Sequence, residues 1–149
     1  MTAIELKYKT SRLNVLVSGE EFQLQNQAAE PPNRYLVIED LVRVERLLSA
    51  GKATEGFVVF LTNNPRYWSR GLEQGCDISA AFRIHEGRRL AGTLSWAAHT
   101  ATGTMGKHSA PLTLRGEYKA RWSDYSRVRG HGPGVFRYLA VEVRPPNKE

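Results

Sequence analysis

The segment IELKYK, from Ile4 to Lys9, decides the first interpretation of this sequence, because apolar and charged residues alternate along it. In a β-strand, residues two apart lie on the same face, so Ile4 and Leu6 share one face while Glu5 and Lys7 share the other. The strand rise separates Glu5 and Lys7 by about 7 Å. A carboxylate can ligate Mg²⁺ while a neighbouring ammonium group orients water or holds charge on a phosphate, as metal-dependent phosphodiester cleavage requires. The same pair also suits a solvated strand face with a cross-strand ion pair.

Downstream of this strand, the pattern predicts a hairpin and then one long helix. Alternation over Leu13 to Val17 and Phe22 to Gln25, with a glycine turn between them, predicts a β-hairpin. Pro31 and Pro32 are expected to break regular structure. A helix is predicted from Tyr35 to Ser49, with Asn33 as its N-cap and Gly51 as its stop. Its buried stripe comprises Val37, Leu41, Val44 and Leu48.

The remaining chain is expected to be rich in strands. The run GFVVFL, from Gly56 to Leu61, predicts a strand buried on both faces. Further strands are predicted at Ala81 to Ile84, Leu90 to Trp96, Leu112 to Trp122 and Phe136 to Val143. Together these elements predict an α+β fold in which one main helix packs on a mixed β-sheet.

The order of these elements resembles the PD-(D/E)XK nuclease superfamily. The matching pieces are the Glu5-Leu6-Lys7 strand, the helix and the following hydrophobic strand, within about the first 60 residues. The whole chain is also similar to a set of bacterial proteins that share ELKYKT, FLTN and FRYLAVEV. The resemblance implies a restriction-endonuclease-like core fragment over residues 1–63 and a β-rich C-terminal half over residues 64–149. It also implies Mg²⁺ as cofactor, with Glu5 as metal ligand and Lys7 orienting the attacking water.

The sequence departs from this family at one point. The family places a metal-binding aspartate on the strand before the Glu-x-Lys strand, and only three residues precede Ile4 here. Three explanations stay open. The protein is degenerate or truncated, the start is assigned too late, or the carboxylate has migrated to Asp40 or Glu45 on the helix. Arg43 lies three residues from Asp40, so it can pair with Asp40 or face Glu5 and Lys7 and contact phosphate.

A second signal is a basic stretch in the C-terminal half. Its arginine and lysine side chains are interleaved with Tyr118, Trp122 and Tyr125, which suits phosphate contacts and base stacking in a nucleic-acid groove. Glu117 and Asp124 dilute the charge, so a solvated β face is the alternative. The candidate nucleic-acid-binding residues here are Arg115, Lys119, Arg121, Arg127, Arg129 and Arg137.

Composition limits the class of protein. The 149 residues predict one domain, over residues 1–149, and no apolar run is long enough to cross a membrane. Fifteen of the 21 basic residues are arginine and the net charge is +6, which favours a nucleic acid or another polyanion as partner. The single cysteine, Cys76, and the lack of a signal peptide predict a cytoplasmic protein.

These observations lead to three functional hypotheses. The first is a nuclease-related DNA-processing protein that, if active, is an Mg²⁺-dependent endonuclease, and that is degenerate or incomplete because the upstream aspartate is absent. The second is a non-catalytic nucleic-acid-binding module. The third is a small interaction or assembly protein. In the third, Trp68, Trp96 and Trp122 contribute to a partner interface. Whichever function holds, the edge strand Ile4 to Lys9 is expected to pair with another chain, as in a homodimer, or to be covered by the C-terminal half.

Overall fold

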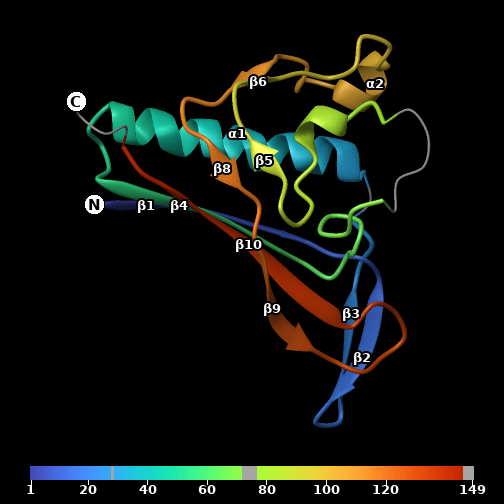
Figure 1. Ribbon diagram of the computed structural model, residues 1–149. Coiled ribbons are helices and arrows are strands. Elements are labelled where there is room, and N and C mark those ends of the chain that lie inside the picture. The colour runs from blue at the N-terminus through green and yellow to red at the C-terminus, as the bar shows by residue number, and fades with distance from the viewer. Residues whose placement is uncertain (28, 72–76, 146–149) are drawn as a thin grey trace.

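The computed structural model describes residues 1–27, 29–71 and 77–145 (Figure 1). Its longest elements are the helix α1 and the four strands of one sheet. Several two-residue strands follow β4 along the chain. In chain order the elements are β1 (Thr2–Lys9), β2 (Leu13–Val17), β3 (Glu20–Leu24), α1 (Glu30–Ser49), β4 (Glu55–Thr62), the 3-10 helix η1 (Ala80–Phe82), β5 (Arg89–Leu90), β6 (Thr93–Leu94), α2 (Thr102–Met105), β7 (Leu112–Thr113), β8 (Tyr118–Lys119), β9 (Trp122–Arg127) and β10 (Val135–Val143).

The main sheet is mixed, which confirms the predicted α+β class. Its strand order is β1-β4-β10-β9, with β1 parallel to β4 and the other two pairs antiparallel. The hairpin β2–β3 and helix α1 form the connection between the parallel strands β1 and β4. In Figure 1 the helix lies along one side of this sheet, and the short elements η1 and β7 contact the helix. β1 is therefore an edge strand, and no strand of the C-terminal half pairs with its free side within residues 77–145.

Helix α1 begins earlier than the sequence predicts. The two prolines, expected to break structure, lie in its first turn, and Ala29 rather than Asn33 is the N-cap. The first helical backbone bond runs from the amide of Asn33 to the carbonyl of Ala29. The backbone N–H groups of residues before Asn33 have no carbonyl partner within the helix. Pro31 and Pro32, which lack this N–H group, are therefore tolerated there. The helix ends at Ser49, and Gly51 follows with a φ of 68°, as the predicted stop requires.

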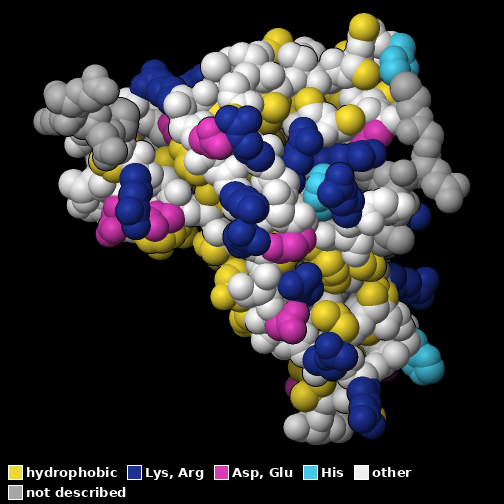
Figure 2. Space-filling view, viewed as in Figure 1, with side chains coloured by type: hydrophobic (Ala, Val, Ile, Leu, Met, Phe, Trp, Pro, Cys, Tyr) yellow, Lys and Arg dark blue, Asp and Glu magenta, His cyan; other side chains and the backbone are white. Residues whose placement is uncertain are grey.

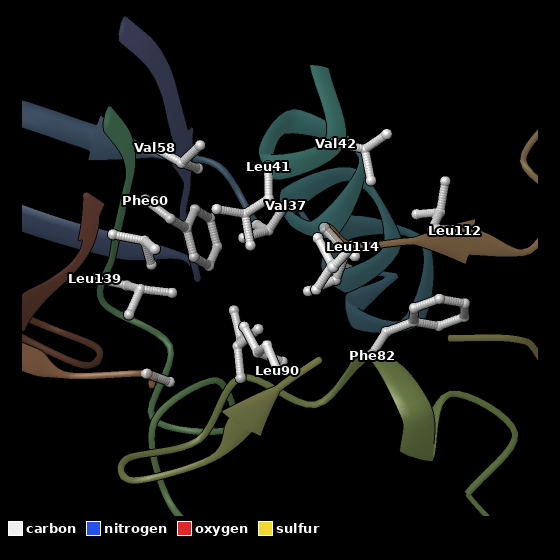
Figure 3. Close-up of a cluster of buried hydrophobic side chains, with 14 of the residues drawn as sticks. Val37, Leu41, Val42, Val58, Phe60, Phe82, Leu90, Leu112, Leu114 and Leu139 are labelled. Atoms are coloured by element: carbon white, nitrogen blue, oxygen red, sulfur yellow. The ribbon is translucent and has the colours of Figure 1, made fainter. Parts of the chain in front are cut away.

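The hydrophobic core fills both sides of α1. The predicted stripe is buried along its whole length, from Val37 to Leu48. Figure 3 shows Val37 and Leu41 pointing towards Val58 and Phe60 of β4, while Val42 lies near Leu112 on the opposite side. The helix is therefore a middle layer between the sheet and the irregular segments of residues 80–120.

Strand β4 is central in the sheet, but only one of its faces is buried. Gly56, Val58 and Phe60 are buried towards α1, whereas Phe57 and Val59 are partly exposed on the other face. The prediction of a strand buried on both faces is thus wrong. The physical reason is that the described residues place no layer over the outer face of the sheet.

The predicted hairpin and the last strand are confirmed as β2–β3 and β10. Three other predicted strands are wrong in detail. The 3-10 helix η1 overlaps the first half of the range 81 to 84, β5 and β6 replace one strand over the range 90 to 96, and the range 112 to 122 is split into β7, β8 and the start of β9. Gly92, with a φ of 69°, turns the chain between β5 and β6. Cys76 lies outside the described residues, and no described helix has the length and apolarity to span a membrane.

Candidate functional site

Strand β1 has the predicted alternation, but its apolar face is the exposed one. The side chains of Ile4 and Leu6 are 64% and 72% exposed. Glu5 and Lys7 are partly buried, because their face of the strand points towards α1. A strand that served only to build a core would have the opposite orientation, since burying apolar side chains is favourable and burying charges is costly.

The charged face of β1 meets two charged side chains of α1. The Nζ atom of Lys7 lies 3.1 Å from Oδ2 of Asp40. The Nη1 atom of Arg43 lies 3.0 Å from Oε1 of Glu5 and 3.3 Å from Oδ1 of Asp40. Four residues proposed from the sequence therefore come together, and we call them the β1–α1 cluster. Both placements of Arg43 considered from the sequence occur together, because Arg43 pairs with Asp40 and also faces the Glu5–Lys7 side of the sheet.

Asp40 is the most buried member of the β1–α1 cluster, with 4% of its side chain exposed. Burial raises the pKa of its carboxyl group, and the hydrogen bond and charge of Lys7 oppose that rise. The hydrogen bond to Glu5 raises the pKa of Arg43. The Arg43 side chain is 51% exposed, so the cluster is buried at Asp40 and opens to solvent at Arg43.

The β1–α1 cluster offers carboxylate oxygens, which are the kind of ligand that Mg²⁺ takes. Its two carboxylates are close to the smallest number that holds this ion. Glu5 and Asp40 contact the same Nη1 atom of Arg43, so their carboxylates lie close together. Mg²⁺ is commonly held by one or two carboxylates together with substrate phosphates. Within the described ranges, no group of three or more His, Cys, Asp or Glu side chains is placed to hold a metal ion. Glu5 and Asp40 are therefore the residues that would hold Mg²⁺, which would activate water and stabilise charge on a phosphate.

Glu45, the other helical carboxylate considered from the sequence, lies elsewhere. It is five residues beyond Asp40, which places it roughly 140° further around the helix. Its carboxylate accepts hydrogen bonds from the backbone N–H groups of Arg115 and Gly116 and from the hydroxyl of Tyr118, at 2.7 to 3.1 Å. Glu45 thus anchors the segment 115–118 to α1 and contributes nothing to the β1–α1 cluster.

The six basic residues of the C-terminal half are spread over the molecule. Arg121 contacts Glu86 at 3.4 Å, and Arg137 contacts Asp124 at 2.9 Å and lies over the ring of Trp68. Arg115 donates to the hydroxyl of Ser49, while Lys119, Arg127 and Arg129 are exposed. Strand β9, which carries Arg127, is at the opposite edge of the sheet from β1, about 14 Å away across three strand spacings. The structure therefore does not bring the basic stretch to the β1–α1 cluster.

Two of the three tryptophans considered for a partner interface, Trp96 and Trp122, are buried. In the core, Trp96 packs on Phe82 and Trp122 packs on Phe60. Trp68 is partly buried and packs against Trp122. Trp96 and Trp122 therefore fill the interior, whereas part of Trp68 reaches the surface.

A second group of charged residues was missed by the sequence analysis. Arg34, Arg66, Arg83 and His85 line one small pocket beside the N-terminal half of α1. They come from positions up to 51 residues apart in the sequence, so no local spacing indicates them.

No family model matches the chain, and no curated protein or solved structure matches it either.

Proposed function

We propose that the protein is a nuclease-related DNA-processing protein whose phosphate-handling site is the β1–α1 cluster. One observation carries this proposal. Strand β1 turns Glu5 and Lys7 inward to meet Asp40, at the cost of exposing Ile4 and Leu6. An acid and a lysine on the same strand face, joined by a second carboxylate, supply the groups that metal-dependent phosphodiester cleavage uses.

The ion pairs of the β1–α1 cluster are expected to weaken metal binding there. Lys7 and Arg43 neutralise both candidate metal ligands, so a cation must compete with them for Glu5 and Asp40. With only two carboxylates, the cluster is expected to hold Mg²⁺ weakly. We therefore expect DNA binding together with cleavage that is slow or absent.

The experiment measures plasmid cleavage with Mg²⁺ and Mn²⁺, and DNA binding over a range of salt concentrations. The variants are Lys7→Met and Arg43→Gln, with Lys9→Met as the matched control, because Lys9 is on the same face of β1 but outside the cluster. Two results support the proposal. One is cleavage that Lys7→Met abolishes and Lys9→Met leaves intact. The other is salt-dependent binding without cleavage that Arg43→Gln weakens. A wild-type protein that neither binds nor cleaves DNA would overturn it.

A second candidate function is assembly of two copies through β1. The observation that favours it is that this eight-residue edge strand has an apolar face open to solvent. Antiparallel pairing of two copies with Leu6 opposite Leu6 of the partner subunit would set Glu5 opposite Lys7 of the partner subunit. The same register sets Ile4 opposite Tyr8 of the partner subunit. Opposite charges and aromatic–aliphatic pairs across strands are favourable, so β1 is complementary to itself.

The oligomeric state tests this second candidate. Light scattering coupled to size-exclusion chromatography is expected to give a dimer for the wild-type protein and a monomer for Leu6→Lys. Leu16→Lys is the matched control, because Leu16 is 69% exposed on the hairpin and Leu6 is 72% exposed on β1. A wild-type monomer across the accessible concentrations would exclude assembly through β1.

A further inference from the structure

Arg43 holds a different place in the β1–α1 cluster from Lys7. A single atom of Arg43, Nη1, lies 3.0 Å from Oε1 of Glu5 and 3.3 Å from Oδ1 of Asp40. Lys7 contacts the other carboxylate oxygen of Asp40, Oδ2, at 3.1 Å. If Arg43 moved away, one oxygen of each carboxylate would therefore be freed, and the Lys7–Asp40 pair would stay as it is.

Arg43 and a divalent cation compete for the same space. A cation that ligates both Glu5 and Asp40 would lie between the two oxygens that Nη1 of Arg43 now contacts. Two positive charges a few ångströms apart repel each other strongly. Arg43 in its present position and a bound ion therefore exclude each other, whereas Lys7, on the other oxygen of Asp40, need not move.

The contacts of Arg43 allow it to leave. Its side chain is 51% exposed, whereas that of Asp40 is 4% exposed, so Arg43 enters the cluster from the solvent side. Ion pairs at such exposed positions are weak and are screened by salt. A second acceptor lies outside the candidate metal ligands, because Oε2 of Glu39, one helical turn earlier, is 3.9 Å from Nη2 of Arg43. Another anion can thus draw Arg43 away from Glu5 and Asp40.

A DNA phosphate is the anion suited to this exchange. A planar guanidinium group matches phosphate oxygens and donates two parallel hydrogen bonds to them. The net charge of +6 attracts DNA, and Figure 2 shows Lys and Arg side chains spread over the face in view with fewer acidic ones between them. The phosphate would also add oxygen ligands to the two carboxylates, which is the usual way of holding Mg²⁺.

We propose that Arg43 makes metal binding conditional on DNA. Without a phosphate, Arg43 fills the space between Glu5 and Asp40. With a phosphate, it turns outward and the two carboxylates accept the ion. This inference rests on the proposed function, because it concerns regulation of the same site. Binding of DNA and binding of the ion are then coupled, and each strengthens the other by the same factor.

The first experiment measures Mn²⁺ affinity without DNA, from the electron paramagnetic resonance signal of the free ion. Arg43→Gln is expected to bind Mn²⁺ about tenfold or more tightly than the wild-type protein, because a positive charge close to the ion is removed. The double variant Glu5→Gln/Arg43→Gln should lose this gain. Arg46→Gln is the matched control, because Arg46 is exposed on the same helix and the variant removes the same charge outside the cluster. Thermal melting shows which variants are folded, and Arg43→Ala is made beside Arg43→Gln so that the test does not depend on one variant.

The second experiment measures the affinity for a short DNA duplex by fluorescence anisotropy, with Mg²⁺ or with a chelator at constant ionic strength. Mg²⁺ is expected to tighten DNA binding by the wild-type protein about tenfold relative to its effect on Glu5→Gln, in which the ion has lost a ligand. The Glu5→Gln variant also reports the general effect of Mg²⁺ on DNA.

The two experiments separate this inference from the proposed function. Equal Mn²⁺ affinity in Arg43→Gln and the wild-type protein, or an equal gain in Arg46→Gln, would overturn the inference even if DNA binds. The same effect of Mg²⁺ on DNA binding by the wild-type protein and Glu5→Gln would overturn the coupling. A wild-type protein that binds no DNA would overturn the proposed function and the role of phosphate, while a specific gain of Mn²⁺ affinity in Arg43→Gln would still show that Arg43 excludes the ion.

Discussion

The ammonium group of Lys7 and the carboxylate of Asp40 lie 3.1 Å apart across the boundary between β1 and α1. Asp40 is nearly buried, and Lys7 is 20% exposed. The pair therefore joins the edge strand to the helix through a charge contact. This contact makes the stability of the fold depend on the same residues that we propose for the chemistry.

Replacing Lys7 by methionine is expected to lower the free energy of unfolding by about 1–3 kcal/mol. The variant leaves Asp40 buried without its ammonium partner, and Arg43 compensates only in part. Urea unfolding of Lys7→Met beside Lys9→Met measures the difference. Equal losses in the two variants would show that the Lys7–Asp40 pair stabilises nothing.

The contact between β4 and α1 is expected to be sensitive to a single methyl group. A Cβ atom added at Gly56 would lie 2.1 Å from Cγ1 of Val44, so Gly56→Ala forces the strand and helix apart. Overpacking of this kind costs about 1–3 kcal/mol. Thermal unfolding of Gly56→Ala should show this loss. Gly103→Ala is the control, because nothing lies within 4 Å of the added atom there, and it is expected to unfold as the wild-type protein does.

Asn63 is expected to be one of the most sensitive polar residues. It is fully buried, its Nδ2 donates to the carbonyls of Ser11 and Pro133, and its Oδ1 accepts from the N–H of Ser11. Asn63→Ala leaves these backbone groups without partners and should cost about 3 kcal/mol, because each buried unsatisfied group costs about 1–3 kcal/mol. Asn64→Ala, at a partly buried neighbour, should cost less. Chemical denaturation would rank the two, and the reverse order would contradict this account.

His85 should make stability depend on pH. Burial and the surrounding arginines hold its pKa below the ordinary 6.5, so the folded state binds a proton less readily than the unfolded state does. Stability from this group is therefore fully present above about pH 6.5 and is lost as the pH falls below that value towards the lowered pKa of the folded state. Urea unfolding between pH 5 and 8 should show a weaker pH dependence for His85→Gln than for the wild-type protein. Parallel curves would argue against a shifted His85.

The elements predicted correctly from the sequence are those whose signal is local and long. The helical stripe from Val37 to Leu48, the hairpin and the strand β10 each extend over several periods of their pattern. The wrong predictions concern short elements. Strands of two residues, such as β5 and β7, have no period to detect. Where a strand was predicted from Ala81, the chain forms a 3-10 turn over Ala80–Phe82, because tertiary packing outweighs strand propensity.

The candidate site was only partly predictable for the same reason. Spacing along one strand relates Glu5 to Lys7, and spacing along one helix relates Asp40 to Arg43, so the β1–α1 cluster could be proposed from sequence. Which face of β1 points inward depends on where α1 packs, and alternation alone does not determine it. The basic pocket could not be predicted, because the chain path alone brings Arg34 beside His85.

The position of β10 has a consequence for biosynthesis. β4 lies between β1, the first strand, and β10, the last, so the centre of the sheet is completed only after Val143 has been made. While the ribosome is still translating the intervening segment, β4 has an unpaired edge and one side of α1 is uncovered. Nascent chains of this protein are therefore expected to depend on chaperones until late in translation, and chains ending before Val135 are expected to be degraded.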